Sequence, residues 1–449
     1  MTASAIPAPA QTPANRRPRA PLRAVRTGRS QAPAPLDPWL GAQAINLRRH
    51  AAALGPLRRE EFEAGPATVT EGHIQAANEL LGSLRRGLLA VSADVATATA
   101  RARADRTTTS IQRTLAQKAR GHDWVMATER VWDFYFELFT QRQSQFGSWL
   151  LACDRIALSC YQAAYTGIES TRSVPAPGPF CYMRTGFSPA TFRRGLRLRR
   201  LGRLPNPFPL IQLPYHRLVN PWTLGAVLHE VCHNLQNDLG LATAVPHAIE
   251  QRLRSEGLSA RVAQVYARWN RETFADLGAL LLGGPAVVAS LMDVVGRAPA
   301  TVVDYSPTGP HPTPWIRVLI SCELLRRMRF SAAAEGYKRT WLRAYPDGRA
   351  GSIPEAVVRT APDAIAIVVD TICYQPYASL GNKALAECIR FRPKDEALAA
   401  QAAQRMAAGT DPGVVPPRYL IGAARIALDR RYARPETIAR RFYEELAGR

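Results

Sequence analysis

The sequence predicts a mainly α-helical fold with a small β-sheet, and three observations support this fold class. Apolar residues recur at steps of three and four over most of the chain, which is the spacing of a helix with one buried face. Beyond the first 36 residues, only residues 171–219 break this pattern, because eight prolines punctuate that stretch. A hydrophobic fraction of 47% with 21% charged residues is typical of globular proteins, and 449 residues can form a large core.

The composition divides the chain into four regions. Residues 1–36 are rich in Ala, Pro and Arg and contain no acidic residue, so we expect a disordered basic tail. Helical periodicity predicts helical regions at residues 37–170 and 331–449. Between them, residues 171–330 hold the small sheet and the candidate site. The tail is a solvated segment in the simpler interpretation and a tether to nucleic acid or another acidic surface in the alternative.

The net charge bears on the partners of the protein, and the cysteines bear on the compartment in which it works. A net charge of +22 suits an acidic partner. Ala, Arg and Pro are all abundant, however, which is the composition that coding bias produces, so the charge alone is weak evidence for such a partner. Seven cysteines without CxxC pairs predict free thiols in a reducing compartment. The longest apolar run, residues 277–292, is interrupted by Gly and Pro and is too short to span a membrane. With no secretory signal sequence, these features predict a cytoplasmic protein without a transmembrane segment.

Two short strands are expected in the proline-rich stretch, at residues 180–184 and 210–214. A basic cluster between them is either a solvated face or a site for an acidic polymer or an acidic substrate. The cluster consists of Arg193, Arg194, Arg197, Arg199, Arg200 and Arg203.

Residues 220–240 contain the most specific motif of the chain. Asn220 suits a helix N-cap, Pro221 suits the first turn, and Gly240 suits the left-handed position that often ends a helix. Apolar residues at three- and four-residue steps between them predict a buried face. Residues 229–233 read HEVCH, which is an H-E-x-x-H pattern.

The H-E-x-x-H pattern indicates a metal site. His229 and His233 are one helical turn apart, so both imidazoles can reach one ion. Glu230 lies beside them, where it can contact a metal-bound water. The alternative is a helix with two ordinary, partly buried histidines. Cys232 lies about 100° from His233 around the helix, so we expect it in the core and not as a ligand.

A second helical segment, residues 246–282, supplies a third candidate ligand. A catalytic zinc ion needs three protein ligands and keeps a fourth position for water. Glu272 is a natural third ligand, and Asp276 one turn later can accept the outer N–H of a liganding histidine. Carboxylates at this spacing also occur on exposed helices, but the residues around this pair are too apolar for a freely exposed helix.

These elements resemble the gluzincin metallopeptidases, in which H-E-x-x-H is followed by a Glu ligand and by an Asp four residues later. A third element sharpens the resemblance. His311-Pro312 followed by Arg317 is similar to the H-P-x-x-x-x-R element of the HtpX and CAAX-prenyl-protease family. The resemblance covers residues 220–317.

The resemblance implies a zincin-like catalytic core and a role for each site residue. The three Zn²⁺ ligands would be His229, His233 and Glu272. Glu230 would be the general base, Asp276 would contact a liganding histidine, and His311 and Arg317 would shape the cleft. An edge strand would lie beside the active-site helix, and either predicted strand is a candidate for it.

The predicted function is a soluble zinc-dependent peptidase, an endopeptidase in type, that acts on peptides or proteins. Peptide hydrolysis develops an oxyanion that needs a second donor besides zinc, and His311 and Tyr305 are the candidates. His311 is a loop residue without a role in the alternative interpretation. The alternative function is a non-catalytic or latent zincin-like module that binds a partner or nucleic acid through its basic surfaces.

Overall fold

The computed structural model describes residues 35–62, 65–169, 173–186, 188–348 and 351–448. Within them the protein is mainly helical and has two small sheets, which confirms the predicted fold class. Apart from its last two residues, the predicted basic tail lies outside the described residues. No helix in these ranges is both long enough and apolar enough to cross a membrane.

The elements follow one another in an order that is helical at both ends. The N-terminal helices are α1 (Leu36–Ala53), α2 (Glu71–Asp105) and α3 (Thr108–Thr140). The central elements are α4 (Gly147–Gly167), β1 (Phe180–Met183), β2 (Ala190–Phe192), β3 (Leu210–Leu213), α5 (Tyr215–Val219), α6 (Gly225–Asp238), α7 (Leu241–Ser255), α8 (Ala260–Gly283), α9 (Pro285–Val295), α10 (Pro299–Val302) and α11 (Pro314–Arg327). The C-terminal elements are α12 (Ser331–Ala344), α13 (Glu355–Cys373), β4 (Pro376–Tyr377), β5 (Lys383–Ala384), α14 (Leu385–Cys388), α15 (Pro393–Ala408), α16 (Leu420–Asp429) and α17 (Pro435–Gly448).

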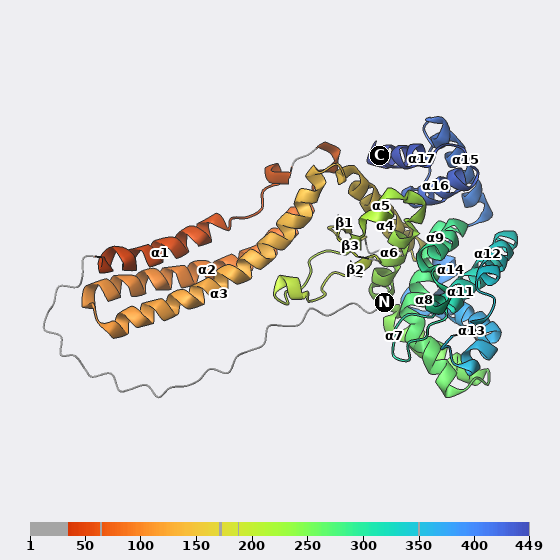
Figure 1. Cartoon of the computed structure of the whole chain (residues 1–449), viewed down its shortest axis with the longest axis horizontal. Helices are drawn as coiled ribbons and strands as arrows, with labels where there is room; N and C mark the ends of the chain where they lie inside the picture. The colour runs from red at the N-terminus through yellow and green to blue at the C-terminus, as the bar shows by residue number, and fades with distance from the viewer. Residues whose placement is uncertain (1–34, 63–64, 170–172, 187, 349–350, 449) are drawn as a thin grey trace.

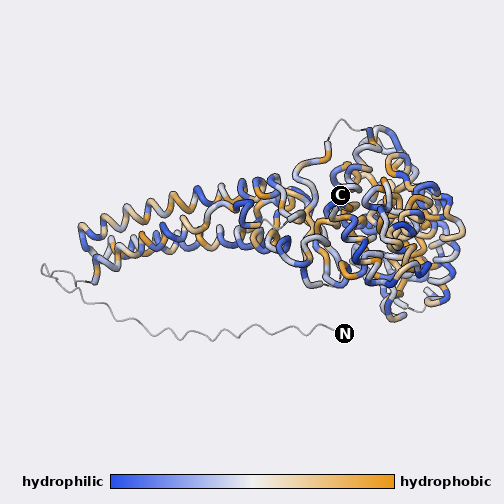
Figure 2. Tube along the Cα trace, turned by 90° about the horizontal axis from the view of Figure 1, so that it is seen from above, coloured by the Kyte–Doolittle hydropathy of each residue, from blue (hydrophilic) through white to orange (hydrophobic). Residues whose placement is uncertain are grey.

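Helices α1, α2 and α3 form an arm that extends away from the other elements, which we call the body (Figure 1). α2 and α3 make a long hairpin, and the hydroxyl of Thr107 caps the start of α3 by accepting from the backbone N–H of Ser110. α1 packs along the distal half of the hairpin, where Asp37 pairs with Arg106 at 3.0 Å. Figure 2 shows the same elongated outline after a turn of 90°.

The three-stranded sheet lies where the arm meets the body (Figure 1). Its order is β1-β3-β2, with β1 parallel and β2 antiparallel to the central strand β3. β1 and β3 are the two predicted strands. The edge strand that contacts α6 is neither of them but β2, so the expectation for that strand is wrong. β2 has three residues, which is too short to show an alternating pattern, and Arg193 follows it directly.

Helices α6 and α8 pack closely against each other in the body. A Cβ atom on Gly278 of α8 would lie 2.8 Å from Sγ of Cys232 on α6, so a larger residue would force the helices apart. Cys232 is buried in this contact, as expected for a core residue. All seven cysteines are buried free thiols.

Candidate metal centre

The helix that carries the H-E-x-x-H pattern begins later than predicted. Asn220 does not cap it: a short 3-10 turn at Pro221–Thr223 intervenes, and the Asn220 amide donates to the carbonyl of His216. α6 starts at Gly225 without a side-chain cap. Gly240 has a φ of 70°, which is the left-handed conformation predicted for it.

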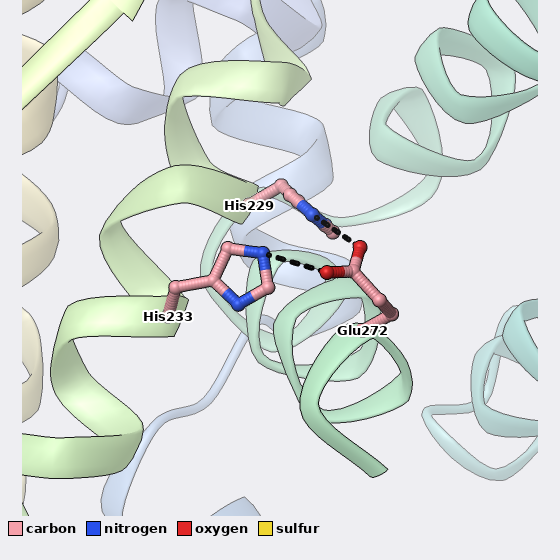
Figure 3. A group of neighbouring side chains, drawn as sticks. All are labelled: His229, His233 and Glu272. Carbon is pink, nitrogen blue, oxygen red and sulfur yellow. Dashed lines mark ion pairs between the residues drawn. The ribbon is translucent and has the colours of Figure 1, made fainter. Parts of the chain in front are cut away.

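Three side chains from α6 and α8 converge (Figure 3). Nε2 of His229 lies 3.4 Å from one carboxylate oxygen of Glu272, and Nε2 of His233 lies 3.4 Å from the other. One ligand atom from each residue lies within 4.8 Å of the other two. The structure thus brings together the three residues predicted as ligands, and this group can hold a metal ion.

The spacing fits a small ion in tetrahedral coordination. Bonds of about 2.05 Å at tetrahedral angles place two ligand atoms about 3.4 Å apart. Each imidazole Nε2 lies at that distance from one oxygen of Glu272, the two nitrogens face different oxygens, and one ligand atom from each residue lies within 4.8 Å of the other two. Two imidazoles and one carboxylate are also a donor set that leaves a fourth position open. The residues present therefore fit a divalent metal ion.

Asp276 and Arg317 fix the orientation of His229. Nδ1 of His229 lies 2.8 Å from a carboxylate oxygen of Asp276, which leaves Nε2 facing Glu272. The Arg317 guanidinium donates to both oxygens of Asp276, at 2.5 and 2.9 Å. This pair is buried, since only 7% of the Asp276 side chain and 13% of the Arg317 side chain are exposed. A carboxylate held in this way orients a liganding imidazole and selects its tautomer.

The two histidines differ in their protonation. Burial, reinforced by the charge of His229, lowers the pKa of His233 to about 3, so this ring is neutral, as a ligand must be. Burial disfavours the charged form of His229 as well, but the Asp276 carboxylate outweighs it and raises the pKa to about 10. Binding of an ion at Nε2 of His229 would therefore release a proton.

The carboxylates next to the histidines also differ in their protonation. Burial opposes ionisation of Glu272, but the hydrogen bond and the charge of His229 hold its pKa below the usual range. For Glu230 burial prevails and raises the pKa to about 7, although the charge of His229 opposes this shift. Glu230 forms no ion pair with any described residue. A carboxyl group that titrates near neutral pH is suited to take up and release a proton.

A cavity of about 380 Å³ adjoins the three ligand residues and includes Glu230 in its wall. The walls come from β2 and the residues before it, from α6, α8 and α9, and from the loop and helix that carry His311 and Arg317. No described residue of the arm lines the cavity. Sequence reasoning missed Arg271 and Thr191, which line the cavity as well. In the sequence, the only hint was that Arg271 directly precedes the predicted ligand Glu272; nothing marked Thr191 as a cavity residue.

His311 and Tyr305 take different positions. His311 lines the cavity with 62% of its side chain exposed, and its Nε2 lies 3.5 Å from a carboxylate oxygen of Glu272. Tyr305 is not among the lining residues. Its hydroxyl accepts from Arg268 at 3.1 Å, and its ring packs edge-on against Trp269. The role of oxyanion donor predicted for Tyr305 therefore finds no support in its position.

The predicted basic cluster lies on the loop between β2 and β3. Five of its six arginines are exposed, and the sixth, Arg194, donates to the carbonyl of Pro177. None of the six forms an ion pair within the part of the chain that the structure describes. A solvated face accounts for this arrangement, and an acidic partner stays a prediction.

Comparison with known proteins assigns no family, since no protein-family model, no curated protein and no solved structure matches the chain. The resemblance to gluzincins therefore depends on the motif residues and on their arrangement in space.

Proposed function

We propose that the protein is a zinc-dependent peptidase of the gluzincin type. The observation that supports this most directly is the convergence of three ligand atoms, from His229, His233 and Glu272, within 4.8 Å of one another. Two ordinary core histidines would need no carboxylate between them and no proton acceptor beside them. Three protein ligands that face a cavity are also typical of a catalytic ion, whereas structural zinc sites are closed by a fourth protein ligand.

In this proposal the residues of the chain divide the work of hydrolysis. A bound zinc ion supplies an acidified water and polarises the peptide carbonyl. Glu230 takes the proton from the attacking water and passes it to the leaving amine. His311, at the exposed side of the cavity, donates a hydrogen bond to the carbonyl oxygen. Asp276 and Arg317 keep His229 in the orientation that the reaction needs.

The walls of the cavity favour an extended peptide as the substrate. β2 is an edge strand of its sheet, and its residues Ala190 and Thr191 line the cavity. Asn234 of α6 donates to the hydroxyl of Thr191 at 2.9 Å, which fixes the strand relative to the helix that carries the histidines. A peptide that pairs with β2 through its main chain would place a peptide bond beside Glu230.

Metal analysis combined with a cleavage assay on an unfolded protein tests the proposal. We expect about one zinc ion per chain in the wild type, its loss in Glu272→Ala and its retention in Glu230→Gln. Glu230→Gln should lose cleavage by about a hundredfold or more, because the proton acceptor is removed. Glu256→Gln is the matched control, since Glu256 is exposed and lies outside the cavity.

Two outcomes would contradict this function. Wild-type protein that binds no zinc, even after reconstitution, would eliminate the metal centre. Zinc binding without cleavage of any tested protein or peptide would favour the alternative, a latent or non-catalytic zincin-like module that binds a partner.

A further inference from the structure

The cavity beside the metal-binding residues has two ends of different chemistry. At one end α8 contributes Arg271, and the loop before α11 contributes His311. About two turns along α8, Ala279 lines the cavity together with Val287 and Leu291 of α9. At 1.5 Å per residue, Arg271 and Ala279 are separated by about 12 Å along the helix axis. The second end is apolar, so it offers no partner for a charged group.

Arg271 differs from the other cationic side chains of the cavity. Arg317 is engaged, because it pairs with Asp276 and lies 3.6 Å from Glu272. His311 lies 3.5 Å from Glu272. Arg271 is exposed and forms no ion pair with any residue that the structure describes, although it directly precedes Glu272 in the chain. Its guanidinium is a planar fork of N–H donors that matches the two oxygens of a carboxylate.

The wall formed by β2 leads directly to positive charge outside the cavity. β2 lines the cavity and is followed directly by Arg193, the first arginine of the exposed basic loop. Five of these arginines are exposed and none of the six forms an ion pair within the described ranges, although the charge of Asp238 acts on Arg193 and Arg194. A negatively charged ligand is therefore attracted toward this side of the molecule before it reaches the cavity.

We propose that Arg271 binds a carboxylate of the substrate, either an acidic side chain or the C-terminal carboxylate of a peptide. This role rests on the proposed peptidase function and adds that the substrate carries a carboxylate near the cleaved bond. Arg271 is the neighbour of the ligand Glu272, and an extended peptide advances about 3.5 Å per residue. The carboxylate therefore lies within about two residues of the bond that is cleaved. Recognition of a side-chain carboxylate is compatible with cleavage inside a chain, and recognition of a terminal one is typical of a carboxy-terminal exopeptidase.

Peptide binding tests the inference without turnover. Zinc-loaded Glu230→Gln protein is titrated with four fluorescent heptapeptides that differ in Glu or Gln at the central positions and in a free or amidated C-terminus. We expect the peptide with the recognised carboxylate to bind about five- to tenfold more tightly than its neutral partner. Adding Arg271→Glu should remove this preference and favour a matched Lys peptide. Arg261→Glu is the control, because Arg261 lies on the same helix, is exposed and does not line the cavity.

The four peptides also separate the sources of the carboxylate. Loss of affinity on replacing Glu by Gln identifies an acidic side chain, and loss on amidation identifies the C-terminus. Equal affinity for all four peptides, no binding by any of them, or the same change in Arg261→Glu and Arg271→Glu would overturn the inference. A failure of the peptidase function would instead appear as missing zinc or missing cleavage in the wild type, and the same titration on metal-free protein would still measure the charge dependence of binding.

Discussion

Helix α2 of the arm and helix α8 of the body are both long helices, yet they bury their side chains in different ways. In α2 the buried residues after Leu81 recur at steps of three to seven, so one face is covered and the other is in water. In α8 every residue from Glu272 to Gly283 is buried. Other helices of the body, among them α6, α7, α9 and α13, pack around α8, whereas α2 packs mainly against α1 and α3.

This difference explains why the candidate site lies in the body. A carboxylate or an imidazole changes its protonation and binds an ion most strongly where water is excluded, and a helix covered on all sides offers several such positions close together. Glu272 and Asp276 occupy them on α8. The distal arm encloses only a small apolar cluster, which includes Leu47, Leu88 and Val125, and it also buries hydroxyl groups such as that of Thr128.

Breaking one Arg–Asp pair in the body and one in the arm should give the largest difference in stability. Arg317→Met leaves the buried Asp276 with His229 as its remaining partner, and we expect it to lower the free energy of unfolding by about 3 kcal/mol. Arg106→Met breaks the exposed pair with Asp37 in the arm, and we expect a loss of at most about 1 kcal/mol. Urea unfolding followed by circular dichroism measures both, in the presence of a chelator so that metal binding does not contribute.

The matched variants Asp276→Asn and Asp37→Asn control for the loss of the arginine stem. Each keeps the Arg side chain and its packing and removes only the charge of the carboxylate. If Arg317→Met and Arg106→Met lowered the stability equally, the distinction between a covered and a half-exposed helix would be wrong.

Removal of a large apolar side chain should give a smaller contrast in the same direction. Leu280 of α8 and Leu88 of α2 are both fully buried, so the loss of transferred surface is the same in Leu280→Ala and Leu88→Ala. The cavity left in the body cannot collapse, whereas the helices of the arm can move together. We expect Leu280→Ala to cost about 1–2 kcal/mol more than Leu88→Ala. Unfolding curves of the two variants give the difference, and a larger loss for Leu88→Ala would contradict it.

The sequence predicted local features of the site well. His229 and His233 are four residues apart on one helix, so their common direction follows from helix geometry alone. The motif pattern also predicted that Glu272 lies beside the two histidines. The structure shows how this happens: α6 and α8 approach closely because Gly278 has no side chain at their contact. The capping role of Asn220 was wrong, because a cap depends on the conformation of the following turn and not only on residue type.

Features that depend on packing between distant segments were not visible in the sequence. β2 is a strand because it pairs with β3, and its three residues carry no strand pattern of their own. Arg271 faces the cavity because α8 is oriented by its neighbours. The helical periodicity of the arm predicted its helices, but the same periodicity suits a helix that packs on the body. The direction in which the arm extends could not be predicted from it.

A shortened arm should leave the metal centre unchanged, which is the smallest expected effect. The variant lacks residues 1–56 and joins residue 84 to residue 128 through a short Gly-Ser linker. α2 and α3 lie side by side there, since Leu81 and Val131 share one buried cluster and Leu88 and Val125 share another. Leu57, whose backbone is held by the Asn78 side chain, is retained.

We expect the same zinc content as in the full chain, because no described residue of the arm lines the cavity. Metal analysis decides the matter. Equal zinc would show that the site forms without the distal arm, and a loss of zinc at unchanged helicity of the body would show that the distal arm supports the packing of α6 and α8.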